Sequence, residues 1–194
     1  MKKVLIATTN KDKYKIVAEL FRKTIFSSDE YEISPITNDM NIPDEKETGS
    51  NIDRARTKAI NAHKVLKDEF DYICGLDDAV RIKGELDPNI KLVVNKILYE
   101  NYLDEGETYS FNRAYVIIDK DGNIYETSID IPYSYHALEN NFELKEHSYP
   151  LSHVACPLGT TTPLSDLDEK ETDEYYLKYT KDDLMKLKKL ILSN

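Results

Sequence analysis

The chain begins with a short apolar run that leads directly into a helix pattern through small polar residues. The run covers residues 4–7, and Thr8, Thr9 and Asn10 follow it, with Lys13 a few residues on. When a buried strand ends this way, the unpaired N–H groups and the positive dipole end of the next helix face whatever lies above the sheet, and anions bind there. The segment predicts a phosphate-binding turn. The alternative is an ordinary strand-to-helix turn in which Asn10 only caps the helix.

Alternating helix and strand patterns follow, and they predict an α/β fold with a mixed sheet. We expect helices over residues 11–25, 51–66, 90–103 and 181–192, strands at 31–36 and 71–78, and a hairpin at 109–131, with 132–150 left unassigned. Thr180 and Asp183 have the spacing of a capping box for the last helix. A chain of 194 residues without an internal repeat or linker predicts one domain over residues 1–194.

Composition limits the partners of the chain. Acidic residues outnumber basic ones by 36 to 26, giving a formal net charge of −10, which argues against a nucleic-acid polymer as partner. No apolar stretch reaches the length of about 18 residues that a membrane span needs, and the first apolar run is too short for a signal peptide. We therefore expect a cytoplasmic protein that does not contact a membrane. Cys74 and Cys156 lie in apolar runs and are expected to be buried free thiols.

Two adjacent carboxylates, Asp77 and Asp78, end a buried strand candidate. Adjacent residues on a strand point to opposite faces, but at a strand end the chain turns and both can face the crevice where open α/β sheets bind ligands. Together with an acid of the loop at residues 44–47, they suit Mg²⁺, which takes few carboxylates plus substrate phosphates and waters. One of them could instead deprotonate water, and a surface role is the alternative. Lys58 lies at the edge of the apolar stripe of the 51–66 helix and can reach into a cleft.

Four motifs, taken in order, resemble the inosine triphosphate pyrophosphatase family, also called the Ham1-like family. They are Thr8-Thr9-Asn10-x-x-Lys13, Glu47-Thr48-Gly49, Asp53-x-Ala55-x-x-Lys58-Ala59 and Leu76-Asp77-Asp78. Family members typically show T-G-N-x-x-K, E-T-G, E-N-A-x-x-K-A and D-D-S-G in the same order. The similarity is good over residues 1–80 and weaker beyond them.

The resemblance implies an elongated, two-lobed α/β fold of the ITPase and Maf type, with a mixed sheet, and usually a homodimer. Its central cleft would bind a nucleoside triphosphate with Mg²⁺ and cleave it between the α and β phosphates, giving a nucleoside monophosphate and pyrophosphate. By motif, phosphates would be held by Thr8, Thr9, Asn10, Lys13 and Lys58, metal by Glu47 and Asp78, and water by Asp77 or Asp78. The catalytic residues implied are Asp77, Asp78 and Lys58.

Departures from the family pattern fall on base recognition. Ala79-Val80 replace the S-G of D-D-S-G, and Lys178-Tyr179-Thr180 stand where the family has S-H-R. Because unmatched polar edges of a base are costly to desolvate, we expect an altered base specificity. The candidate base contacts are Tyr149, His153 and Tyr179. A non-catalytic nucleotide-binding or regulatory protein of the same fold is the alternative function, and hydrolysis at the sugar–base bond is a further one.

Overall fold

The computed structural model describes residues 1–43, 48–137 and 150–193. Its helices and strands, in chain order, are β1 (Lys2–Ala7), α1 (Lys11–Lys23), β2 (Tyr31–Pro35), α2 (Asn51–Leu66), β3 (Tyr72–Ile82), β4 (Glu85–Asp87), α3 (Ile90–Tyr99), β5 (Thr108–Asp119), β6 (Ile124–Tyr135), β7 (Ala155–Cys156) and α4 (Glu169–Leu192). Short 3₁₀ helices lie at Asn38–Met40, Pro150–His153 and Leu164–Asp166.

The strands form one mixed sheet, which confirms the predicted fold class. Their order is β2-β1-β3-β5-β6-β7, and β4 pairs with β3 outside this path. β1 is parallel to both β2 and β3, whereas the β3–β4 and β6–β7 pairs are antiparallel. Parallel neighbours require helical crossovers, and α1 and α2 supply them.

The chain divides into two compact units. The first comprises Met1–Asp77, Arg113–Ile129 and Leu177–Asn194, and the second Asp78–Asn112 and Asp130–Tyr176. Both units are built from segments that are far apart in the sequence. The expectation of a single domain over residues 1–194 stays a prediction.

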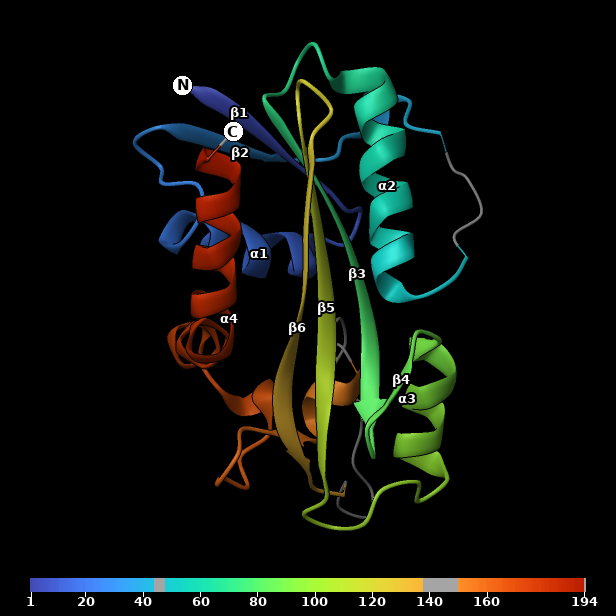
Figure 1. Cartoon of the computed structure of the whole chain (residues 1–194). Helices are drawn as coiled ribbons and strands as arrows, with labels where there is room; N and C mark the ends of the chain where they lie inside the picture. Colours follow the sequence, from blue (N-terminus) through green and yellow to red (C-terminus); the bar gives the residue numbers. More distant parts are fainter. Residues whose placement is uncertain (44–47, 138–149, 194) are drawn as a thin grey trace. The chain divides into compact units, whose positions relative to one another are not determined.

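In the first unit, helices cover both faces of the sheet (Figure 1). Strand residues alternate between these faces. Leu5 of β1 belongs to an apolar cluster with Ala62 and Leu66 of α2. On the opposite side, the ring of Tyr115 in β5 lies 5.9 Å from that of Phe21 in α1. The unit is therefore a layered α/β structure whose core forms on both sides of β1, β3 and β5.

Three helix boundaries differ from expectation. Helix α1 ends at Lys23 rather than at residue 25. Helix α3 ends at Tyr99 rather than near residue 103, and Asn101 just beyond it has a positive φ of 50°, which does not continue a helix. Helix α4 begins at Glu169, so Thr180 lies inside it and is fully buried instead of capping it. The start is marked by Asp168, which accepts from the N–H of Glu171, while the Glu171 carboxylate accepts from the N–H of Asp168. This Asp-x-x-Glu pair is a capping box that our sequence prediction missed.

The predicted hairpin is present, and Asp119 organises its turn. Its carboxylate accepts from the N–H groups of Asp121 at 3.0 Å and Asn123 at 2.9 Å, and from the hydroxyl of Tyr125 at 3.2 Å. Burial raises the pKa of Asp119, but the hydrogen bonds, led by those from Asn123, outweigh it and hold the pKa below its ordinary value. The ionised carboxylate is thus the form that the folded turn prefers.

Replacing Asp119 with asparagine should lower the free energy of unfolding by about 1–2 kcal/mol at pH 7, because an amide cannot accept all of these hydrogen bonds. Because the pKa of Asp119 is lower in the folded protein than in the unfolded chain, the carboxylate stabilises the fold at pH values above its unfolded-state pKa, which is near 4. This stabilisation is lost as the pH falls through the folded-state pKa. Urea unfolding should therefore show a smaller difference in the free energy of unfolding between the wild type and Asp119→Asn near pH 3 than at pH 7. Asp121→Asn, in the same turn, is the control and should change little; an equal loss at both pH values would contradict the prediction.

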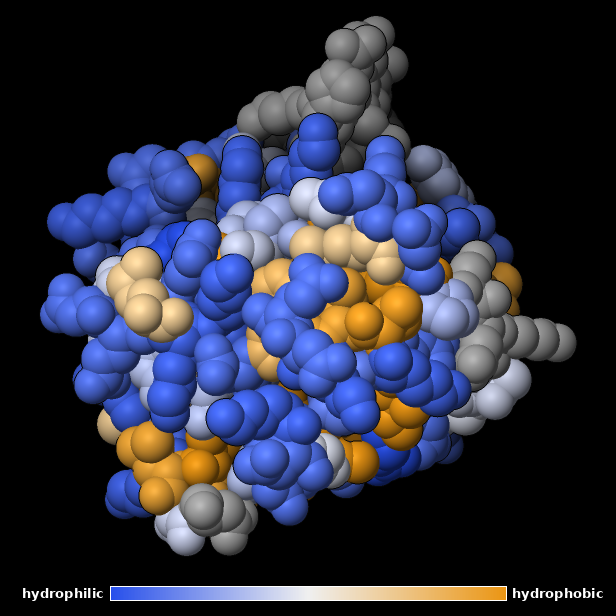
Figure 2. Space-filling view, turned by 90° about the horizontal axis from the view of Figure 1, so that it is seen from above, coloured by the Kyte–Doolittle hydropathy of each residue, from blue (hydrophilic) through white to orange (hydrophobic). Residues whose placement is uncertain are grey.

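Both cysteines are buried and free, as predicted. Burial raises the pKa of Cys156 to about 11 and raises that of Cys74 further, so both thiols stay protonated at neutral pH. Hydrophilic residues cover most of the face shown in Figure 2, with smaller hydrophobic areas between them. None of the helices within residues 1–43, 48–137 and 150–193 contains an apolar segment of the length that a membrane span requires.

Candidate functional site

A pocket of about 510 Å³ lies in the first unit, where the parallel strands β1 and β2 end. Its wall is formed by the residues after β1, the segment after β2 and one face of α2. The lining residues are Ala7, Thr8, Thr9, Ile36, Thr37, Asn38, Asn41, Ile42, Pro43, Thr57, Lys58 and Asn61. Ligands of open α/β sheets bind at such carboxyl ends, and the volume is that of a small-molecule site.

The pocket brings together three of the residues predicted to bind phosphate, namely Thr8, Thr9 and Lys58. Sequence reasoning missed the other polar lining residues, among them Thr57 and Asn61. The sequence could have indicated Asn61, which lies three residues after Lys58 on the same helix, and then Thr57, which lies four residues before Asn61, because residues three or four apart are neighbours on a helix surface. The polar residues after β2 gave no comparable signal, because their position over the pocket depends on how that segment folds back.

Lys58 forms an ion pair with Asp77 of β3. Its ammonium nitrogen lies 2.6 Å from Oδ1 of Asp77 and 3.2 Å from the carbonyl oxygen of Leu76. The Asp77 side chain is 13% exposed and that of Lys58 27%. A charge this deeply placed requires a partner, and each of the two groups supplies it for the other. The ammonium is therefore held at the pocket wall rather than extended into solvent.

Close contact between α2 and β3 makes this pair possible. A Cβ atom on Gly75 would lie 2.0 Å from the carbonyl oxygen of Ala55 and 2.7 Å from the nitrogen of Ala59. Glycine on the strand and alanines on the helix thus let the two backbones approach, and Lys58 then reaches Asp77, two residues beyond Gly75. The predicted apolar stripe of this helix and the position of Lys58 at its edge are confirmed.

The first turn of α2 is tied to the sheet by a hydrogen-bonded network. Ser50 caps the helix, and its N–H and hydroxyl donate to Oδ2 of Asp53 at 3.1 and 2.6 Å. Arg56 donates to Oδ1 of Asp53 at 2.8 Å and, with its other edge, to both carboxylate oxygens of Glu126 in β6. Hydrogen bonds from Ser50, and then the Arg56 guanidinium, hold the pKa of Asp53 below its ordinary value. This network fixes the end of α2 that precedes Lys58.

The turn after β1 contains the helix cap considered as the alternative to a phosphate site. Oδ1 of Asn10 accepts from the N–H of Lys13 at 2.9 Å, and the N–H of Asn10 donates to the hydroxyl of Thr8 at 3.3 Å. The capping hydrogen bond uses the side-chain oxygen of Asn10, and the side-chain nitrogen of Asn10 takes no part in it. The phosphate-binding roles of Thr8, Thr9, Asn10 and Lys13 stay predictions.

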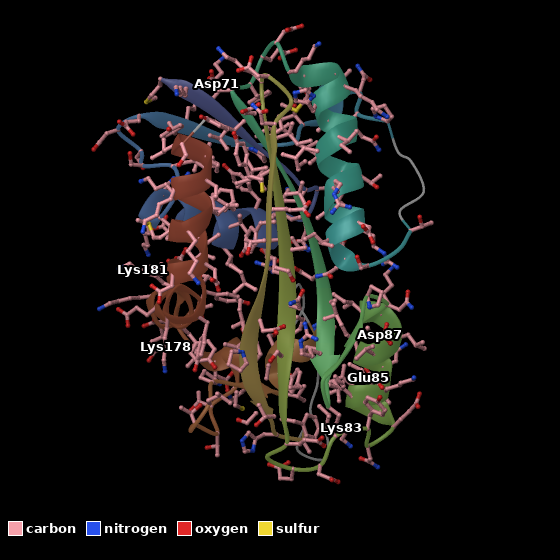
Figure 3. The ribbon with its side chains drawn as sticks, viewed as in Figure 1. Asp71, Lys83, Glu85, Asp87, Lys178 and Lys181 are labelled. Atoms are coloured by element: carbon pink, nitrogen blue, oxygen red, sulfur yellow. The ribbon has the colours of Figure 1, made fainter. Side chains whose placement is uncertain are left out.

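The strand that was expected to end at Asp77 and Asp78 continues to Ile82. Asp71 and Lys83, the residues just outside its two ends, are labelled in Figure 3. The expectation that the strand ends and the chain turns at the acid pair was wrong, because β3 continues through both aspartates. The catalytic and metal-binding roles of Asp77 and Asp78 stay predictions. Asp77 belongs to the first unit and Asp78, which is half-buried, to the second.

The remaining predicted site residues are dispersed. Glu47 and Tyr149 lie outside the described residues. His153 is 5% exposed in the second unit. Tyr179, half-buried in the first unit, has the ammonium of Lys178 5.1 Å from its ring centroid. Among the described residues, no group of three or more His, Cys, Asp or Glu side chains could hold a metal ion.

Solved structures of other proteins share this fold. A HAM1 protein from Coxiella burnetii has a TM-score of 0.65 and 15% identity, with all of both chains covered. A Ham1 protein from Staphylococcus aureus has a TM-score of 0.63 and 15% identity, with 99% of each chain covered. A nucleoside-triphosphatase / dITP/XTP pyrophosphatase from Mycobacterium abscessus has a TM-score of 0.58 and 16% identity, over 95% of this chain and 97% of that one. No family model and no curated protein matches the sequence. At these low identities the likeness establishes the fold alone, which is the fold of the Ham1 proteins.

Proposed function

We propose that this protein is a nucleotide pyrophosphatase and a divergent member of the Ham1-like family. It hydrolyses a nucleoside triphosphate between the α and β phosphates to a nucleoside monophosphate and pyrophosphate. The observation that carries the proposal is the Lys58 ammonium, 2.6 Å from Asp77 and in the wall of a pocket that Thr8 and Thr9 also line. The order of the sequence motifs and the Ham1 fold support it.

In this reaction the protein mainly positions the phosphates and stabilises charge. Attack of water at the α-phosphorus develops negative charge on phosphoryl oxygens, which a fixed ammonium and hydroxyl donors stabilise. Lys58 would supply the ammonium, and Thr8 and Thr9 the hydroxyls. Asp77 orients Lys58 through the ion pair, and Asp77 or Asp78 orients or activates the water.

Magnesium belongs to the proposal as cofactor. When bound, it would neutralise phosphate charge, and the residues proposed to hold it are Glu47 and Asp78. Carboxylates are the hard oxygen ligands that this ion takes, usually one or two together with phosphates and waters. Tyr149, His153 and Tyr179 remain the proposed base contacts, and a homodimer in the cytoplasm is the proposed state of the protein.

The test is release of pyrophosphate and of phosphate from a panel of standard and modified ribo- and deoxyribonucleoside triphosphates, with and without Mg²⁺. We expect metal-dependent pyrophosphate from a narrow subset of the panel. Nucleotide binding without any product would instead favour the non-catalytic nucleotide-binding protein. Appearance of free base would indicate hydrolysis of the sugar–base bond and would also contradict the proposal.

A further inference from the structure

Asn61 is a buried amide in the wall of the pocket. It is 3% exposed, and it lies on the same helix as Lys58, three residues further along. Residues three apart on a helix are neighbours on its surface, here about 4.5 Å apart along the axis. The amide of Asn61 and the ammonium of Lys58 therefore lie next to each other in the wall of the pocket.

The amide of Asn61 makes long hydrogen bonds for a group so deeply buried. Its Nδ2 donates to the carbonyl oxygen of Pro43 at 3.5 Å, and its Oδ1 accepts from the ammonium of Lys64 at 3.4 Å. Ordinary hydrogen bonds with nitrogen donors are about 2.9–3.0 Å long. Because a poorly paired buried amide is costly, this one is suited to take a better partner from a ligand in the pocket.

We propose that Asn61 binds a second phosphate of the substrate, next to the one held by Lys58, and so selects polyphosphate chains over single phosphates. Lys64 donates to Oδ1, so the ligand would be met by Nδ2, which has two hydrogens and uses one of them in the 3.5 Å bond to the carbonyl of Pro43. A phosphoryl oxygen is an acceptor, so it matches Nδ2. The ammonium of Lys64 strengthens that donor by polarising the amide. Lys64 is in this sense a positioning residue. The inference rests on the proposed function for the identity of the substrate.

Binding of inorganic tripolyphosphate and of inorganic phosphate, measured by calorimetry, tests the proposal without a base or turnover. The wild type should bind tripolyphosphate more tightly than phosphate. Asn61→Leu, which keeps the approximate shape, should weaken tripolyphosphate binding about tenfold and leave phosphate binding unchanged. Lys64→Met, an exposed substitution, should weaken tripolyphosphate binding about threefold and decides the matter if Asn61→Leu does not fold. Lys67→Met, at the C-terminal cap of this helix and outside the pocket lining, is the control and should match the wild type.

Three results would overturn the inference: a wild type without preference for tripolyphosphate, unchanged binding in the variants, or equal weakening for both ligands. Its failure is separable from that of the proposed function. If Asn61 supports tripolyphosphate binding but no nucleotide is hydrolysed, the inference stands and the hydrolase fails. If nucleotides are hydrolysed with the same kcat/KM by wild type and Asn61→Leu, the inference alone fails.

Discussion

Replacing Lys58 with methionine should reduce kcat/KM for nucleoside triphosphates by about 10²- to 10³-fold. This is the effect of removing one preorganised hydrogen-bond donor that stabilises the transition state. The same change leaves the Asp77 carboxylate without the ammonium 2.6 Å away. Since this pair is neither fully buried nor exposed, we expect a loss of about 1–3 kcal/mol in the free energy of unfolding. Steady-state kinetics and urea unfolding measure the two effects separately.

A double variant with Asp77→Asn and Lys58→Met separates the effect of losing Lys58 on stability from its effect on activity. The double variant has no buried carboxylate to pair, so its free energy of unfolding should recover toward the wild-type value. Its kcat/KM should stay low, because the ammonium that meets the phosphates is still missing. Full activity in either variant would show that Lys58 does not contact the reacting phosphates.

Replacing Gly75 with alanine should lower the free energy of unfolding by about 3 kcal/mol or more, the upper range for overpacking a core. The new Cβ would lie 2.0 Å from the carbonyl oxygen of Ala55, which is backbone and cannot move without shifting α2. Ala59→Gly should not rescue the variant for the same reason. Chemical denaturation measures the change, and any protein that folds should bind tripolyphosphate less well because Lys58 moves with the helix.

Gly122→Ala is the matched control for this substitution. Gly122 lies in the hairpin turn with a φ of 89°, and no atom lies within 4 Å of the position that a Cβ would take. Only backbone strain is then added, about 1–2 kcal/mol. If both variants lost the same stability, the close contact of α2 with β3 would not be the cause.

Much of the fold was predictable from local patterns. The strand–turn–helix start, the apolar stripes of α1 and α2 and the hairpin after β5 depend on periodicity and turn residues that are close in sequence. The length of α4 was missed because polar tyrosine-rich turns before Thr180 lack a clear apolar stripe, although Asp168 and Glu171 mark its start. The end of β3 was misplaced since adjacent aspartates are more often found in turns than inside a strand.

The sequence by itself determined the class of the fold, through local propensity and spacing. The resemblance of its motifs to those of the Ham1-like family was what placed Thr8, Thr9 and Lys58 in one site. Only the tertiary structure decided that Lys58 pairs with Asp77, that β3 runs past the acid pair, and that Asn61 faces the same pocket. These facts depend on how closely α2 approaches β3 at Gly75, a distance set by packing between segments that are far apart in the chain.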